Sequence, residues 1–305
     1  MKEPIIVTAF WDVGRSENCE FPRSNERYYA EFAEWARIKN NLIVYTDKYS
    51  ESRIREIRKK YGLEDKTIVI VHDIFKEEEE LLKKMYDVEH NSAFKEFRYR
   101  PEAMENRANF NYAWFMKYWC MAEATKYAHP DDVFAWFDFG FNHMDKCYSN
   151  MNEFSFTWTL NREVSKIQAY SLREVDSIEV FDVLQFMQDT IMGVFFLVPV
   201  SMAEEFWQTI RQAMIALLMI GCIDDDQVLV LIAHKWRPDL IEVNVSKWWY
   251  MALKENGASH LSVKVKEPIK SLRHNLWTKI YDYEHKRNYI KITQKRMNRS
   301  VDSAI

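Results

Sequence analysis

Runs of apolar residues alternate with amphipathic segments through the first half of the chain. Four of these runs are expected to form buried strands, at residues 4–10, 41–46, 67–71 and 133–137. Between them, residues 25–39 place apolar side chains at helical spacing and residues 50–61 predict a very basic helix. Residues 106–127 predict a long helix with aromatic residues all round. Continuous apolar strands separated by helices are typical of parallel sheets that helices cover on both faces. The pattern therefore predicts an α/β fold.

The second half of the chain has a weaker pattern. Two further strands and two helices are expected, at residues 193–198 and 240–243 and at residues 201–221 and 224–234. Ser201 and Glu204 have the spacing of a capping box for the first of these helices. Residues 151–190 stay ambiguous, with strand-like patches at 154–160 and 178–181. No repeat or linker interrupts the pattern, so one domain is expected.

The C-terminal part differs in composition from the rest. After Gly257 the chain becomes polar, and residues 286–299 are rich in Lys and Arg. We therefore expect one domain over residues 1–260 and a helical, basic extension over residues 261–305. Basic side chains interleaved with apolar ones can bind an anionic lipid surface, whereas a basic terminus can also simply be solvated. The first alternative predicts a peripheral contact with the inner face of a membrane.

The composition of the chain excludes several classes of protein. The 305 residues are 48% hydrophobic, which is enough to bury a core, and a formal net charge of −4 excludes the chain-wide positive charge typical of nucleic-acid binding. Six glycines form neither of the glycine-rich phosphate-binding motifs. The longest apolar runs reach about ten residues, roughly half of a membrane span. Four scattered cysteines match no zinc or disulfide pattern, so we expect a cytoplasmic protein with reduced thiols.

The segment VFAWFDFGFNH, at residues 133–143, is the most informative for chemistry. Asp138 directly follows a buried strand, where open α/β sheets bind their ligands, and a carboxylate suits a hard divalent cation. Gly140 allows a ligand to approach the backbone closely, and His143 could bind a metal or a phosphate. The alternative is structural, with Asp138 capping a turn and His143 an ordinary loop residue.

A second acidic segment, CIDDDQ, opens the helix expected at residues 224–234. Acids are favoured at a helix N-terminus, so capping is the structural alternative. Three adjacent carboxylates nevertheless exceed what a cap needs. Because they repel one another, at least one pKa should rise, which suits a general base. Asp225 or Asp226 is the candidate.

The turn after the first strand could hold a nucleotide. Trp11 could stack on a base, Asp12 could bind a ribose or uracil group, and Arg15 could pair with a diphosphate. The alternative is a surface loop with solvated charges. Further on, Gly193 begins a buried strand, and its structural interpretation is a packing glycine. The candidate substrate-binding residues of the first turn and the helix after it are Thr8, Phe10, Trp11, Asp12, Arg15 and Arg27.

The order of three motifs resembles one protein family. TAFWDVGR at residues 8–15, WFDFG at 136–140 and DDDQ at 224–227 resemble the HtrL/YibB family of bacterial proteins, including its WlaTC-like members, over residues 4–240. That family looks like a branch of the GT-A glycosyltransferases. The resemblance therefore implies a GT-A-like, Rossmann-type mixed sheet flanked by helices. It also implies a nucleotide-sugar donor and a glycan or lipid-linked acceptor near lipopolysaccharide or capsule assembly.

The resemblance also assigns roles to residues. In GT-A enzymes an Asp-x-Asp after a buried strand holds Mn²⁺ or Mg²⁺ and the donor diphosphate; here Asp138 matches the first acid and Gly140 replaces the second. His143 or a C-terminal histidine, His274, could complete the metal shell, or arginines could stand in for the metal. Gly193 matches a glycine that contacts the donor or acceptor sugar. In the last motif, Asp225 or Asp226 matches the base of inverting members and Gln227 is expected to contact substrate.

Three functions follow from these residues. The favoured one is a hexosyltransferase-like glycosyltransferase that uses a UDP-sugar, assisted by Mn²⁺ or Mg²⁺, with an aspartate base if the reaction inverts. A metal-dependent phosphohydrolase or nucleotidyltransferase would also place carboxylates at strand ends. A non-catalytic GT-A domain that serves as a binding or scaffold subunit is the third alternative, favoured by the missing second acid at Gly140.

Overall fold

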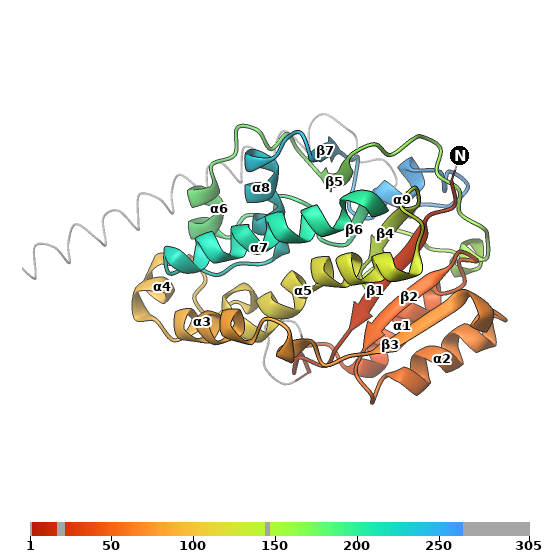
Figure 1. Cartoon of the computed structure of the whole chain (residues 1–305), viewed down its shortest axis with the longest axis horizontal. Coiled ribbons are helices and arrows are strands. Elements are labelled where there is room, and N and C mark those ends of the chain that lie inside the picture. The colour runs from red at the N-terminus through yellow and green to blue at the C-terminus, as the bar shows by residue number, and fades with distance from the viewer. Residues whose placement is uncertain (1, 17–21, 144–146, 265–305) are drawn as a thin grey trace, which may run out of the picture. The chain divides into compact units, whose positions relative to one another are not determined.

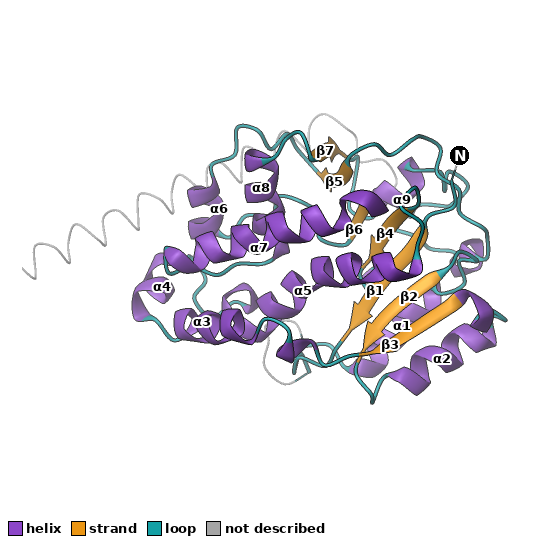
Figure 2. Cartoon of the chain, viewed as in Figure 1, coloured by secondary structure: helices purple, strands orange, loops and turns teal. Residues whose placement is uncertain are grey.

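The computed structural model describes residues 2–16, 22–143 and 147–264. A first compact unit extends to Ser262, and Figure 2 shows its strands flanked by helices. The basic segment 286–299 and His274 lie outside the described residues. Within the described ranges, no helix combines the length and the apolarity needed to cross a bilayer.

One mixed seven-stranded sheet organises this unit, in the order β3-β2-β1-β4-β6-β5-β7. Its strands are β1 Ile5–Phe10, β2 Leu42–Thr46, β3 Thr67–Val71, β4 Val133–Phe137, β5 Ile167–Ser171, β6 Phe195–Pro199 and β7 Ile241–Val245. Strands β1 to β4 pair in parallel, whereas β6 runs antiparallel to both of its neighbours, β4 and β5. The expected α/β fold with a mixed sheet flanked by helices is confirmed.

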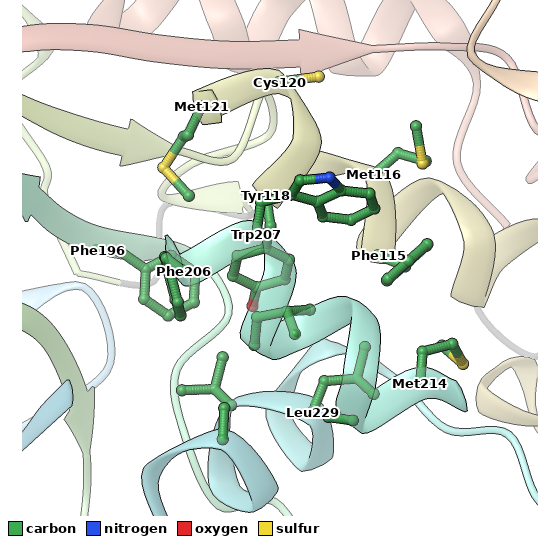
Figure 3. Close-up of a cluster of buried hydrophobic side chains, with 14 of the residues drawn as sticks. Phe115, Met116, Tyr118, Cys120, Met121, Phe196, Phe206, Trp207, Met214 and Leu229 are labelled. Carbon is green, nitrogen blue, oxygen red and sulfur yellow. The ribbon is translucent and has the colours of Figure 1, made fainter. Parts of the chain in front are cut away.

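Three helices cover one face of the sheet. They are α5 (Ala108–Ala124), α7 (Ala203–Met219) and α8 (Asp226–Trp236), and α5 and α7 run side by side in Figure 1. Figure 3 shows the aromatic core that they enclose, in which the rings of Phe115 and Trp207 lie 4.8 Å apart between centroids. Because α5 packs against both β1 and α7, it is buried almost all round, which explains its aromatic sequence.

Helix α1 (Asn25–Trp35) covers the opposite face. Strand side chains alternate between faces, so Phe137 of β4 points away from α5 and contacts Trp35 of α1, with ring centroids 5.2 Å apart. Phe139, just beyond β4, stacks on Phe32 with centroids 4.4 Å apart. Helix α1 therefore fixes the chain that leaves β4. Among the described residues, the other α-helices are α2 Glu51–Lys60, α3 Glu79–Glu89, α4 Ser92–Phe97, α6 Val180–Phe186 and α9 Met251–Glu255.

The structure corrects several local predictions. The strand-like patches at residues 154–160 and 178–181 are not strands. Residues 154–160 form no regular strand, and Val180 of the second patch begins helix α6. The strand of this region is β5. The prediction of a capping box formed by Ser201 and Glu204 is also wrong. The N-cap of α7 is Met202, which makes no side-chain hydrogen bond to the helix. Strand β3 is an edge strand, so Ile68 and Val71 are partly exposed.

Candidate functional site

A pocket of ≈ 460 Å³ lies at the carboxyl ends of β1 and β4. Because β6 runs opposite to β4, the start of β6 meets the end of β4, and Phe137 pairs with Phe195. The Asp138 amide donates to the Val194 carbonyl at 3.1 Å, which extends that pairing into the pocket. The N-terminus of α8 closes the same side, since Asp225 and Asp226 also line the pocket.

A buried lysine joins these segments. Lys117 of α5 donates through Nζ to Asp226 Oδ2 at 2.7 Å, to the Gly193 carbonyl at 2.8 Å and to Asp138 Oδ1 at 3.2 Å. Its side chain is 3% exposed. Burial lowers the pKa of this ammonium, but the negative charges and hydrogen bonds of Asp138 and Asp226 raise it by more. The net shift of the pKa is therefore upward. The lysine is therefore held in its charged form.

Gly193 is a glycine because Asp226 occupies the adjoining space. A Cβ at position 193 would lie 2.3 Å from Asp226 Oδ2, closer than any non-bonded contact allows. The glycine also presents its carbonyl to Lys117. Gly193 therefore lets the start of β6 approach the carboxylate at the start of α8.

Gly140 stands where a side chain would press on residues of a neighbouring helix. A Cβ there would lie 2.8 Å from Glu31 Oε2 and 3.2 Å from the ring of Tyr28, both on α1. Glu31 is buried and bonds Arg27 at 3.0 Å. Gly140, which replaces the second acid of Asp-x-Asp, therefore lies next to the carboxylate of Glu31.

One end of the pocket is basic. Arg15 Nη1 donates to the Tyr28 hydroxyl at 2.8 Å, and the guanidinium carbons of Arg15 and Arg23 lie 6.0 and 5.9 Å from the centroid of the Tyr28 ring. Asp12 beside them accepts bonds from the Gly14 amide and the Asn25 side chain, both at 2.9 Å. These bonds order the loop, and both guanidinium groups can meet an anion there.

The other end is acidic. Asp225 is the N-cap of α8, where Oδ1 accepts from the Gln227 amide at 3.0 Å and Oδ2 from the Gln227 side chain at 3.1 Å. Burial, followed by the charges of Asp224 and Asp226, raises the pKa of Asp225 well above its ordinary value. Asp225 is only half-buried and opens onto the pocket. It can therefore exchange a proton with a bound ligand.

Aromatic rings complete the lining. Phe110 and Trp114 of α5 lie with ring centroids 6.0 Å apart, and Trp249 and Tyr250 line the pocket as well. Trp11 donates from its indole nitrogen to the His72 carbonyl at 3.0 Å, so this ring is fixed in place. Apolar ring faces of this kind suit a nucleobase or a sugar.

The residues expected to bind a metal do not fit one as they are arranged. Asp138 Oδ1 already accepts from Lys117 and, at 2.7 Å, from the Trp136 indole, while the His143 ring bonds the Tyr250 hydroxyl and the Gly140 carbonyl. Among the described residues, no group of three His, Cys, Asp or Glu side chains could hold a metal ion. A metal role for His274 lies outside the described residues. Metal dependence stays a prediction.

The structure brings most of the predicted site residues into one pocket. Those that line it are Phe10, Trp11, Asp12, Arg15, Asp138, Gly140, His143, Gly193, Asp225, Asp226 and Gln227. Two others lie elsewhere: Thr8 is buried in β1, two residues before the pocket-lining Phe10 on the same face of the strand, and Arg27 pairs with Glu31 outside the lining.

Sequence reasoning missed several lining residues. Lys117 is the most important, and its signal was a lysine inside a helix that is otherwise aromatic, since a buried charge must find a partner. Tyr28, Glu105 and Asp189 carried no comparable signal, because surface helices and loops use such residues freely. Only the fold brings them to the pocket.

The comparisons with known proteins give the family. The model of the family described as "Bacterial protein of unknown function (HtrL_YibB)" matches residues 2–254. Protein HtrL of Escherichia coli strain K12 is 22% identical over 267 residues, which cover 80% of this chain and 89% of that protein. A crystal structure of mouse xyloside xylosyltransferase 1, apo form, aligns with a TM-score of 0.42 and 13% identity over 84% of this chain and 91% of that one. With its match over residues 2–254, the chain belongs to the HtrL/YibB family.

Proposed function

We propose that the protein is a glycosyltransferase that takes a sugar from a nucleotide-sugar, with a UDP-sugar as the expected donor. One observation carries the proposal: a single pocket has two arginines at one end and a half-buried aspartate with a raised pKa at the other. Inverting transfer of a glycosyl group needs both a cationic site for the leaving diphosphate and a base for the acceptor hydroxyl.

Asp225 is the better candidate for the base. Asp226 pairs with Lys117 at 2.7 Å, so its carboxylate is engaged in holding the site together. In the proposed inverting step, the acceptor oxygen attacks the anomeric carbon while its proton passes to Asp225. The bond from that carbon to the phosphate oxygen breaks, and its electron pair leaves with the nucleoside diphosphate beside Arg15 and Arg23.

The aromatic lining supports recognition of the two substrates. Trp11 lies in the turn after β1, close in sequence to Arg15, and suits the nucleobase. Trp114 and Trp249 are half-buried and suit the faces of sugar rings. A lipopolysaccharide or capsule glycan, free or lipid-linked, is the expected acceptor, and the cytoplasmic face of a membrane is the expected place of action. A phosphohydrolase would use the same carboxylates without an acceptor.

Nucleotide binding and turnover test the proposal. We expect calorimetry to detect UDP binding in the full chain, and nucleotide-sugars to raise its unfolding temperature. Asp225→Asn should keep UDP binding but lower transfer by about 10²- to 10⁴-fold, the range for loss of a general base. Asp65→Asn is the matched control, because Asp65 is exposed just before β3, at the opposite edge of the sheet.

The outcomes separate the alternatives. Release of phosphate from a phosphoester with no acceptor present would favour the hydrolase. A chain that binds no nucleotide in the screen, with or without Mn²⁺, would contradict the glycosyltransferase and leave the scaffold.

A further inference from the structure

The ammonium group of Lys117 is surrounded by acceptors in the way that a permanently bound cation would be. An ammonium has three N–H donors, and here each has one acceptor: Asp138 Oδ1, Asp226 Oδ2 and the Gly193 carbonyl. The nitrogen also lies 5.5 Å from the centroid of the Trp136 ring and 5.9 Å from that of Phe196. Two carboxylates, one carbonyl and two ring faces therefore surround one positive charge.

The contacts of this charge join elements that are far apart in sequence. Lys117 lies in the middle of α5, Asp138 follows β4, Gly193 precedes β6 and Asp226 opens α8. With the ammonium removed, two carboxylates would face each other in a largely buried space. A positive charge at this point is therefore needed to hold the pocket in its observed form.

We propose that Lys117 is a positioning residue whose ammonium stands in the place of a divalent cation, so that the pocket binds its nucleotide without Mn²⁺ or Mg²⁺. The part that concerns the nucleotide rests on the proposed function. A metal bound to both Asp138 and Asp226 would lie beside the ammonium and be repelled by it. Lys117 could admit the metal only by leaving its three acceptors.

The phosphate groups of the nucleotide would be bound by residues other than Lys117. Because all three N–H groups of Lys117 are engaged, the ammonium has no donor left for a ligand. The diphosphate would instead bind at the basic end, to the guanidinium groups of Arg15 and Arg23. The lysine holds the carboxylates, and the arginines hold the ligand.

Manganese titration of the full chain tests the proposal without any need for activity. We expect calorimetry and electron paramagnetic resonance to show no Mn²⁺ in the wild-type pocket. Lys117→Ala removes the ammonium, opens space between the two carboxylates and should gain a Mn²⁺ site, with an unfolding temperature that rises with Mn²⁺ concentration. Lys126→Met is the matched control, since it removes an exposed lysine that pairs with Glu123 next to the same helix. It should gain no site.

A second arm measures the nucleotide. UDP should bind wild-type protein equally well in EDTA and in Mn²⁺, whereas UDP binding by Lys117→Ala should improve at least tenfold when Mn²⁺ is added. If Lys117→Ala does not fold, Lys117→Gln keeps most of the length of the side chain and can still donate to one carboxylate. It then replaces the alanine variant in both arms.

Three results would overturn the proposal: a wild-type Mn²⁺ site that Asp138→Asn abolishes, UDP binding that EDTA abolishes, or a folded Lys117 variant that gains no Mn²⁺ binding. The second of these would leave the glycosyltransferase standing. Conversely, a chain that binds no nucleotide under either condition contradicts the proposed function, while the Mn²⁺ titration still decides the role of Lys117.

Discussion

At the scale of single residues, the shape of the pocket depends on small residues that leave room for neighbouring side chains. Gly193 leaves room for the Asp226 carboxylate, and that carboxylate in turn binds Lys117. A small change at the glycine must therefore reach the lysine. The motif Asp138-x-Gly140 and the acids at residues 224–226 could be found in the sequence, because they follow or open regular elements. Lys117 could not be assigned, since its partners come from three distant segments.

Gly193→Ala should disable the site while leaving the fold in place. The added methyl group must displace the Asp226 carboxylate, and a misplacement of about 1 Å in such a site can lower the rate of transfer about 100-fold. Steady-state kinetics with the identified donor would measure the loss. Gly62→Ala is the control, because a Cβ at Gly62 meets nothing within 4 Å. It should lower stability only, through its positive φ of 66°. Equal rates for the two variants would contradict the prediction.

Asp225 should make stability depend on pH. Since its pKa in the folded chain is raised above the ordinary value of 3.8, its contribution is fully present below that value and is lost as the pH rises through the raised pKa. Asp225→Asn keeps a good N-cap and escapes this loss. We therefore expect the variant to be more stable than wild type at neutral pH, with the difference vanishing towards pH 4.

Urea unfolding at a series of pH values measures this difference. Asp65→Asn, which changes an exposed carboxyl outside the pocket lining, is the matched control. A difference between Asp225→Asn and wild type that stays constant from pH 4 to pH 8 would contradict the raised pKa.

At the scale of elements, a buried ion pair fixes the helices around the acidic end. Arg98, at the C-cap of α4, donates to Asp224 Oδ2 at 2.6 Å and to Asn106 Oδ1 at 2.6 Å, and it also binds the Leu184 carbonyl of α6. Asp224 is the residue immediately before the N-cap of α8. The pair therefore sets where α8 begins, and with it the position of Asp225.

Arg98→Met should destabilise the fold by about 3–5 kcal/mol, because it leaves the Asp224 carboxylate buried without its partner. The double variant Arg98→Met/Asp224→Leu should recover most of that loss, since both charges are then gone. Guanidinium unfolding measures both. The control Arg237→Met breaks exposed contacts with Glu205 and Asp239 and should have a much smaller effect. A double variant as unstable as Arg98→Met would contradict the account.

The existence of most elements could be predicted from the sequence, and the exceptions have physical causes. Strands β1, β2 and β4 are continuous apolar runs that both faces bury, so their pattern is strong. Strand β5, which reads IQAYS, carries a buried Gln168 whose amide pairs with Glu242, so its pattern is weak. The sequence predicts helix α7, but Ser201 does not cap it. Ser201 lies instead in the short helical turn Val200–Met202 that precedes the helix.

At the scale of the whole molecule, the direction of one strand creates the pocket. Had β6 run parallel to β4, Gly193 would lie at the far edge of the sheet and Lys117 would lack its carbonyl acceptor. Periodicity along one strand says nothing of its neighbour's direction, so the order β3-β2-β1-β4-β6-β5-β7 could not be derived from the pattern of residues. The ends of the apolar strands already pointed to Asp138 and to the turn after β1, whereas the place of Gly193 and of residues 224–226 came from the resemblance.

The basic segment at residues 286–299 should bind anionic membranes. We expect the full chain to sediment with vesicles that contain phosphatidylglycerol and not with pure phosphatidylcholine, and to be released as salt is raised. A chain ending at residue 264 keeps the described unit and should stay in the supernatant. Equal sedimentation of both chains would contradict a role for this segment.

The contact between Gly140 and Glu31 has a consequence for related chains. An acid at position 140 would press on the Glu31 carboxylate, so a shorter side chain at position 31 would accommodate it better. Substitutions at the two positions should therefore be correlated across the family, with Asp at 140 accompanied by Gly, Ala or Ser at 31. Chains that restore the full Asp-x-Asp should also lack a lysine at position 117, so a three-residue covariation would record how the source of positive charge was exchanged during divergence.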